Sequence, residues 1–328
     1  MSGLRLSATF CLASLVSLFS ANAQVPSYQA EQIRKAAPEK ARVAPKKPRT
    51  VLIWNTPPAF MDKDPHKGYC IPYGEVAMKV LGEKTGAFKP VVSDDISIYL
   101  PEKIRQFDAI VMNNSSGPWI RPTNADMEKL KAYGPDADAV EKILRQSLLD
   151  YVAKGGGIMA YHFAIGANTH WPEFQALLGG KFAGHPWNEE VGIKVEEPKH
   201  PLVAAFNGKD FRVTDEIYEF GEPYGRARLR VLLSLDTKKT NMKVQWITRK
   251  EGDFAQAWVR PYGEGRVFYT GFGHRAEIYW NPMLLQFYLD AIQFATGDLA
   301  APAEPRNDSL TRPAAAGPAA ARSRTNTE

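Results

Sequence analysis

Cysteine is scarce in this 328-residue sequence, which contains only Cys11 and Cys70. We expect Cys11 to be removed with a leader segment, so the mature chain would keep one cysteine and could form no internal disulfide. Stability must then come from a hydrophobic core, which a chain of this length can bury. The scarcity also limits catalysis by a thiol nucleophile, because Cys70 would be the one thiol in the mature chain.

Long hydrophobic runs are missing as well, apart from the stretch before Ala23. Arg5 precedes small and aliphatic residues, and Ala21-Asn22-Ala23 is a small-x-small cleavage pattern. Residues 1–23 are therefore predicted to be a secretory signal peptide, which would make the mature protein periplasmic or secreted. An uncleaved membrane anchor is the alternative, although the apolar run is short for a span. We expect no stable membrane insertion of the mature protein.

Positive charge is lacking in the central part of the chain. The formal net charge is +5, but most of it lies in residues 24–48, and residues 51–298 are slightly acidic. A nucleic-acid-binding fold needs a basic face, so we expect no nucleic-acid partner. Residues 24–48 are basic and contain prolines, which predicts a flexible linker. The Ala/Pro-rich residues 299–328 are predicted to be a disordered tail, which leaves residues 49–298 as one folded domain.

The first half of this domain alternates between strand-like and helix-like segments. An uninterrupted apolar run predicts a strand buried on both faces at residues 50–54, and further strands are predicted at residues 88–92, 108–113 and 158–161. Apolar residues at helical spacing predict helices at residues 73–84 and 139–154. The alternation predicts an α/β fold, with an open, mostly parallel sheet and helices on both faces.

The second half has a different pattern. Apolar and polar residues alternate at residues 191–195 and 231–235, and two further strands flank Gly263-Glu264-Gly265 as a hairpin. Asn281 followed by Pro282 predicts the start of a last helix, which ends at Gly297. An antiparallel extension of the parallel sheet fits this half best.

Polar residues follow several predicted strands at the point where each strand ends. In an open parallel sheet, ligands bind just beyond these carboxyl ends. The sequence places Asn55 after the first strand, Asn113, Asn114 and Ser115 after the third, and His162 after the fourth. Later strands contain Glu216 and Tyr218 or lead to His274. We expect these side chains to share one pocket.

The segments GGGIMAYHFAIG, FAGHP, KHPLVAAF, TDEIYEF and GEGRVFYTGFGH occur in this order. Together they resemble the ThuA-like (trehalose-utilisation) family, over about residues 49–297. The resemblance implies a fold related to class I glutamine amidotransferases, which is flavodoxin-like. In that fold a nucleophilic cysteine sits on the turn after a central strand, where this chain has His162. The histidine that partners the nucleophile corresponds to His274, so glutaminase chemistry through a thiolate is not available.

Imidazole is a good metal ligand or general base. We therefore expect His162, His274 and Glu216 to be catalytic. We also expect His162, His185, Glu216 and His274 to hold a divalent metal ion, with zinc as the leading candidate. The alternatives are a core histidine bonded to the backbone at His162, a turn residue at His185 and an ion-paired strand residue at Glu216.

The residues expected to contact a substrate surround this set, and they are Asn55, His66, Asn113, Asn114, Ser115, Trp187 and Tyr218. His66 lies in a loop that would close over the pocket, and Trp187 would stack on a sugar face. Turn chemistry for the asparagines and core packing for the tryptophan are the alternatives. His170 and His200 are expected to be structural.

The resemblance implies a link to disaccharide catabolism. The expected function is that of an exported, metal-assisted lyase or hydratase, isomerase or hydrolase. The expected substrate is a small-molecule carbohydrate, a keto-glycoside or disaccharide derivative. A non-catalytic sugar-binding module that uses the same pocket is the alternative. The sequence leaves the oligomeric state open.

Overall fold

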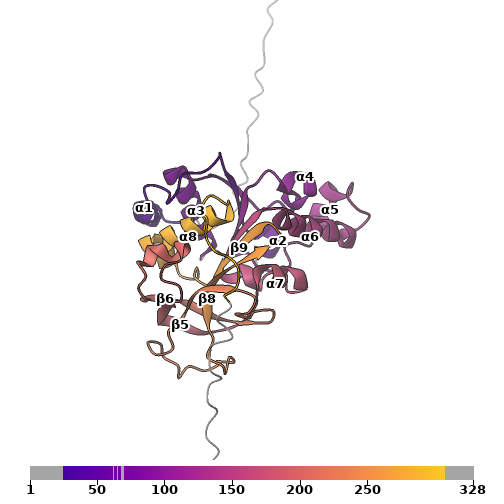
Figure 1. Ribbon diagram of the computed structural model, residues 1–328. Helices are drawn as coiled ribbons and strands as arrows, with labels where there is room; N and C mark the ends of the chain where they lie inside the picture. Colours follow the sequence, from indigo (N-terminus) through magenta and orange to yellow (C-terminus); the bar gives the residue numbers. More distant parts are fainter. Residues whose placement is uncertain (1–24, 62, 65, 68–69, 307–328) are drawn as a thin grey trace, which may run out of the picture.

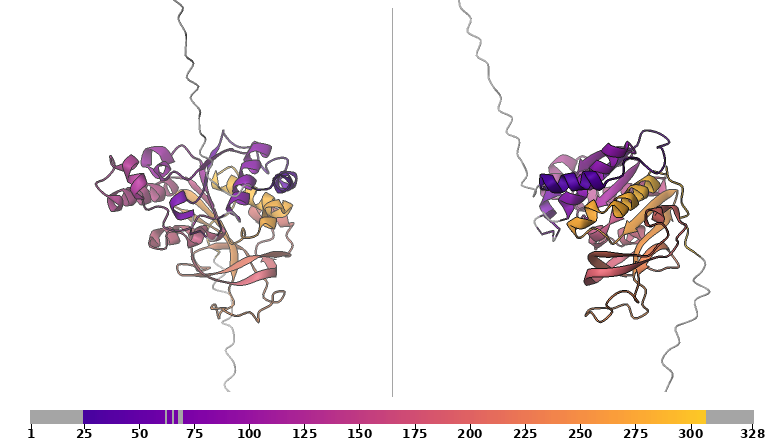
Figure 2. Two further views of the ribbon diagram at one scale, coloured as in Figure 1. Left: turned by 180° about the vertical axis from the view of Figure 1, so that it is seen from behind. Right: turned by 90° about the vertical axis from the view of Figure 1, so that its left-hand side faces the viewer.

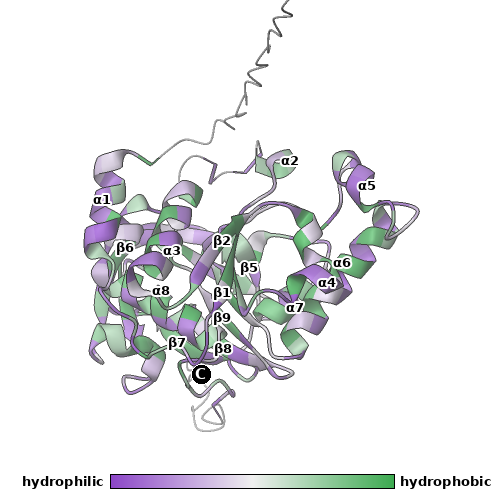
Figure 3. Cartoon of the chain, turned by 90° about the horizontal axis from the view of Figure 1, so that it is seen from above, coloured by the Kyte–Doolittle hydropathy of each residue, from purple (hydrophilic) through white to green (hydrophobic). Residues whose placement is uncertain are grey.

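The computed structural model describes residues 25–306, except residues 62, 65, 68 and 69. The predicted signal peptide and residues 307–328 of the predicted tail lie outside this part of the chain. None of the described helices is both long enough and apolar enough to cross a membrane. In Figure 3 the central strands are largely hydrophobic, whereas the outer helix α1 (Ser27–Ala36) is largely hydrophilic.

Nine strands form one mixed sheet in the order β2-β1-β3-β4-β9-β8-β7-β5-β6. The first five strands in this order are parallel, and the other four continue the sheet in antiparallel fashion. The predicted fold class is therefore confirmed. The strands are β1 (Thr50–Trp54), β2 (Lys89–Ser93), β3 (Ala109–Asn113), β4 (Gly157–Tyr161), β5 (Lys181–Val195), β6 (Phe211–Gly221), β7 (Arg230–Leu235), β8 (Ala255–Tyr262) and β9 (Gly265–Thr270).

Helices cover both faces of the parallel part (Figure 1). Alternate residues of a strand point to opposite faces, so Val51 and Ile53 of β1 join one core cluster, and Leu52 and Trp54 join the other. The first cluster packs under α1, α3 (Ile71–Thr85) and α8 (Pro282–Ala295). The second packs under α4 (Pro101–Ile104), α5 (Asn124–Leu130), α6 (Ala137–Ala153) and α7 (Pro172–Leu178).

Short helical turns connect several of these elements. They are α2 (Pro58–Met61), η1 (Ile96–Tyr99), η2 (His162–Gly166), η3 (Pro201–Phe206) and η4 (Ala276–Trp280). The last helix begins as the sequence predicts, because the Asn281 side chain accepts hydrogen bonds from the backbone N–H groups of Met283 and Leu284.

The segment before β1 is not the flexible linker expected for residues 24–48. Helix α1 buries Ile33 completely, and the Arg42 guanidinium lies 2.7 Å from the carboxylate of Asp290. Asp290 lies on α8 and is fully buried. Residues 25–48 are mostly polar, but the burial of Ile33 and the ion pair of Arg42 with Asp290 hold them against the domain. Leu299 at the other end of the domain is also buried, so the expected tail is packed at its start.

Strands β5 and β6 form a long antiparallel ribbon. The ribbon pairs with β7 only over residues 193–195, and its remaining length extends beyond the sheet edge. Figures 1 and 2 show it projecting from one side of the parallel part. The ribbon can therefore bring its own side chains to the carboxyl ends of β4 and β9.

Candidate metal centre

The backbone turns sharply where β4 ends, at His162. This residue has a φ of 49°, in the left-handed region that residues other than glycine rarely adopt. It begins η2, and its carbonyl oxygen accepts a hydrogen bond of 2.8 Å from the Tyr269 hydroxyl. A backbone held in a sparsely populated conformation is often found at a functional site, and this turn is where the resemblance places a nucleophile.

The two nitrogens of the His162 ring have different partners. Nδ1 donates to the carbonyl oxygen of Gly271 at 2.8 Å, which leaves the lone pair on Nε2. Nε2 lies 2.7 Å from the Tyr218 hydroxyl, 3.3 Å from Nδ1 of His274 and 3.4 Å from Oε2 of Glu216. The ring is fully buried. The alternative for His162 is a core histidine bonded to the backbone, and Nδ1 does make such a bond. Nε2, in contrast, faces the polar side chains of Tyr218, His274 and Glu216.

The loop after β9 brings His274 to the same place. The Asp215 carboxylate on β6 accepts hydrogen bonds from the backbone N–H groups of Gly273 at 2.8 Å, His274 at 3.2 Å and Arg275 at 2.9 Å. Gly273 has a φ of 142°, and a Cβ there would lie 2.9 Å from Cδ2 of Tyr161. Asp215 and Gly273 therefore fix the loop. Neither was a candidate from the sequence, although Asp215 stands next to Glu216.

Four side chains converge at this point, namely those of His66, His162, Glu216 and His274. One ligand atom from each lies within 4.8 Å of the other three. Nδ1 of His274 lies 3.3 Å from Oε2 of Glu216, so three of the donor atoms form a nearly equilateral triangle. Ligand bonds of about 2.1 Å at tetrahedral angles place donor atoms about 3.4 Å apart. The donor atoms of His162, Glu216 and His274 therefore have the spacing that a tetrahedrally bound divalent ion needs, and His66 lies within 4.8 Å of them as a fourth donor.

His66 reaches the cluster from the loop between α2 and α3. Its Nδ1 lies 3.2 Å from Oδ1 of Asp64, and Oδ2 of Asp64 accepts a 3.0 Å hydrogen bond from the Thr56 hydroxyl. A carboxylate or carbonyl on one ring nitrogen of a histidine orients the other nitrogen toward a metal ion. Asp64 supplies this support for His66, as the Gly271 carbonyl does for His162.

The protonation states also suit a metal ion. Burial lowers the pKa of His162 to about 4, although Glu216 acts in the opposite direction. Burial acts to raise the pKa of Glu216, but the hydrogen bond with His162 and the neighbouring imidazoles lower it to about 2. Burial also lowers the pKa of His274. At neutral pH His162 and His274 therefore offer neutral imidazoles and Glu216 an anionic carboxylate, the forms that bind metals.

His185 lies beside the cluster and is not one of the four residues. Its Nδ1 is 3.3 Å from Oε1 of Glu216, the carboxylate oxygen that does not face His162. The side chain is 48% exposed and sits at an irregularity in the pairing of β5 with β6. Three of the four residues expected as ligands, His162, Glu216 and His274, therefore lie in the cluster, and His66 lies where His185 was expected.

The polar side chains at the end of β3 are hydrogen-bonded to neighbouring loops and do not face a substrate. Asn113 is fully buried, and its side chain donates to Oδ1 of Asn55 at 2.7 Å. The Asn114 side chain donates to the Gly273 carbonyl at 3.1 Å. Asn55 in turn donates to Glu75 at 2.7 Å. These amides satisfy buried polar groups between loops, so the expected contacts with a substrate are not available to them.

Ser115 and Trp187 are also out of reach of a substrate. Both are fully buried, and the Trp187 indole donates to the Asn241 carbonyl at 2.8 Å while packing edge-on against Phe254. Two of the expected contact residues differ from these: His66 belongs to the cluster, and the Tyr218 hydroxyl points at Nε2 of His162. Burial keeps the pKa of Tyr218 well above its usual value, so this hydroxyl stays protonated.

The remaining histidine and cysteine side chains have structural surroundings. His170 contacts Glu141 at 2.7 Å, and His200 caps η3 by accepting from the Leu202 N–H. Cys70 is fully buried and burial raises the pKa of its thiol, so it provides no thiolate nucleophile.

Comparisons with known proteins agree with this architecture. A family model described as ThuA, trehalose utilisation, matches residues 50–295. A solved structure of a ThuA-like protein from Bacteroides uniformis is 25% identical, with a TM-score of 0.57, and the match covers 77% of this chain and 92% of that chain. A ThuA-like protein from Parabacteroides merdae is 17% identical, with a TM-score of 0.49, over 80% of this chain and 99% of that chain. No curated protein matches the sequence. The extent of the family match means that this chain belongs to the ThuA family.

Proposed function

We propose that this protein is an exported, metal-dependent enzyme that acts on a keto-glycoside or a related disaccharide derivative. The observation that carries the proposal is the convergence of His66, His162, Glu216 and His274 at the carboxyl edge of the sheet. Family membership supports a carbohydrate-related role. The substrate class and the reaction go beyond that membership and are our inference.

A divalent ion in this cluster would act as a Lewis acid that polarises a carbonyl or hydroxyl oxygen of the sugar. The Asp64 carboxylate and the Gly271 carbonyl orient the rings of His66 and His162 for this purpose. The separations favour zinc, but four protein donors fill a tetrahedral shell. Zinc catalysis would therefore need a fifth ligand position or the release of one donor.

Two other side chains are placed to move protons. The protonated Tyr218 hydroxyl can donate a hydrogen bond to a sugar oxygen that displaces it from His162. His185 is half-exposed at the outer side of Glu216, where its ring can exchange protons with solvent. Removal of a proton from the carbon next to a ketone, with cleavage of the C–O bond on the following carbon and transfer of a proton to the departing oxygen, would give elimination and leave a C=C double bond. The reverse steps would give hydration.

A non-catalytic sugar-binding module is less well supported. The residues expected to bind a sugar in such a module, Asn113, Asn114, Ser115 and Trp187, are all buried. The side chains that converge instead are potential metal ligands and acid–base groups, namely His66, His162, Glu216 and His274.

The proposal is tested with the mature protein and a panel of 3-keto glycosides, with products followed by mass spectrometry. We expect turnover that is lost after chelation and restored by one divalent metal. His162→Ala should abolish it, and His170→Ala should retain it. Binding of the glycosides without turnover at any metal would contradict the proposal and favour the module. N-terminal sequencing of protein from the producing cell tests export, and a retained Met1 would contradict it.

A further inference from the structure

A pocket lies at the opposite edge of the sheet from the histidine cluster. Its volume is about 770 Å³, and its wall includes Gly155 and Gly156, which precede β4. His162 directly follows the same strand. Five strand residues at about 3.3 Å each separate the two edges by about 17 Å. A molecule in this pocket would therefore be too distant to touch the candidate metal centre.

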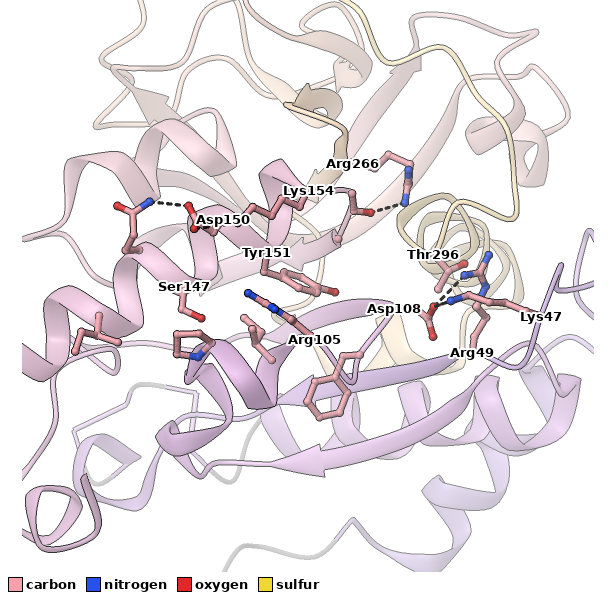
Figure 4. A pocket seen from close by; sticks show the side chains of 17 residues that line it. Lys47, Arg49, Arg105, Asp108, Ser147, Asp150, Tyr151, Lys154, Arg266 and Thr296 are labelled. Atoms are coloured by element: carbon pink, nitrogen blue, oxygen red, sulfur yellow. Dashed lines mark hydrogen bonds and ion pairs between the residues drawn. The ribbon is translucent and has the colours of Figure 1, made fainter. Parts of the chain in front are cut away.

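Basic side chains predominate around the pocket (Figure 4). Five cations and two carboxylates line it, and they are Lys47, Arg49, Arg105, Lys154 and Arg266 with Asp108 and Asp150. The carboxylates are already engaged, Asp108 by Lys47 and Arg49 and Asp150 by Lys154. Neither Arg105 nor Arg266 makes an ion pair with another described residue. Arg266 instead donates to the backbone carbonyls of Ala295 and Gly155. Because five cations face two carboxylates, an anion would meet a net positive charge here.

The lining between these cations combines apolar side chains with hydroxyl groups. Pro101, Ile104, Phe107 and Ile143 line the apolar part. Ser147 and Tyr151 of α6 are more than nine-tenths buried, and their hydroxyl groups have no hydrogen-bond partner among the described residues, although Tyr151 lies near the backbone of Gly157. Unpartnered buried hydroxyls are uncommon in folded proteins. Figure 4 shows both side chains and Arg105 extending into the pocket.

We propose that this pocket binds a small organic anion with an apolar, ring-sized body. The anionic group, a carboxylate, sulfonate or phosphate, contacts Arg105, and the Ser147 hydroxyl turns to donate to one of its oxygens. The body lies against Ile104, Phe107 and Ile143. The volume falls within the range of about 300–1,000 Å³ that is typical of small-molecule sites. A small inorganic ion would make no contact with the apolar side chains, and a neutral molecule would not pair with the arginines.

The probe for this site is 8-anilinonaphthalene-1-sulfonate, which combines an apolar ring system with one anionic group. Its neutral counterpart, N-phenyl-1-naphthylamine, lacks the sulfonate. We expect saturable fluorescence binding of the anionic dye to the mature protein. Arg105→Gln should weaken this binding about tenfold, as expected for the loss of a charge-assisted contact. The same substitution should change binding of the neutral dye little.

Two further variants make the test decisive. Ser147→Phe, which fills the pocket, should abolish binding of both dyes, while circular dichroism and the melting temperature report whether it folds. Arg212→Gln removes an exposed arginine on β6 that pairs with Glu190 and should change nothing. Non-saturable binding, or equal affinities in the wild type and Arg105→Gln, would overturn the proposal. His162→Ala should bind the dye normally, so this result is independent of the proposed enzyme function.

Discussion

If His66, His162, Glu216 and His274 hold a divalent ion, the ion must stabilise the fold by an amount that grows with the logarithm of its affinity. A ligand that binds only the native state adds RT ln(1 + [L]/Kd) to the unfolding free energy. Free metal at about a thousand times Kd contributes about 4 kcal/mol. Domains of this size gain about 2 °C of melting temperature per kcal/mol. Loading the chelated protein should therefore raise its melting temperature by about 8 °C.

The contacts of each residue determine how far its substitution should reduce the metal-induced rise in melting temperature. His162→Ala removes a donor atom, and a hundredfold weaker affinity would reduce the stabilisation to about 1.4 kcal/mol, or about 3 °C. Asp64→Asn keeps all four donors but weakens the support of His66 at 3.2 Å. Loss of such support costs about 10–100-fold in metal affinity, so the shift should fall between that of His162→Ala and that of the wild type.

Differential scanning fluorimetry with zinc, manganese, cobalt and nickel measures these shifts against a chelated control. His170→Ala is the matched histidine variant, because His170 contacts Glu141 outside the cluster. Its own melting temperature should fall somewhat, but its metal-induced shift should equal that of the wild type. Equal shifts in His162→Ala and His170→Ala, or no shift with any of the four metals, would refute the metal centre.

Three further predictions concern the supporting structure. Arg42→Ala should lower the unfolding free energy by about 3 kcal/mol in urea titrations, because it leaves the buried Asp290 without its cation; an unchanged midpoint would mean that the N-terminal segment does not dock. Gly273→Ala should weaken metal binding and lower the melting temperature, since its φ of 142° and its close neighbours do not admit a Cβ; normal metal affinity would show that the loop tolerates it. Burial acts to raise the pKa of Glu141, but its imidazole and guanidinium partners lower it. Its stabilising contribution is therefore present above about pH 4.5 and lost as the pH falls. The stability difference between the wild type and Glu141→Gln should shrink as the pH falls below about 4.5, and a constant difference would contradict the assignment.

The strands and the main helices could be predicted because their signals are local. Uninterrupted apolar runs such as Val51 to Trp54 identify strands that are buried on both faces. Helix α1 could not be predicted in this way, because it buries only Ile33, and the segment after it is held by Arg42, which pairs with Asp290 of α8. That complementarity appears only when the two ends of the folded domain lie side by side.

The candidate site was predictable in position but only partly in composition. The strand ends locate His162 and His274, since every parallel strand delivers its last residue to the same edge. The choice between His66 and His185 depends on the paths of two loops, which residue spacing does not encode. The direction of a side chain is equally hidden, and so Asn113 and Trp187 were expected in the pocket although both point into the protein.

The distances along the chain between the metal-binding residues also affect how the protein folds. His162 and His274 are 112 residues apart, and His66 and Glu216 lie in other elements. Bringing such distant residues together has an entropic cost that only a folded sheet can offset. An unfolded chain would therefore have little affinity for the ion, in contrast to zinc fingers, whose closely spaced ligands fold around the metal. We expect folding to precede metal loading, and mixing experiments should show a refolding rate that does not depend on metal concentration.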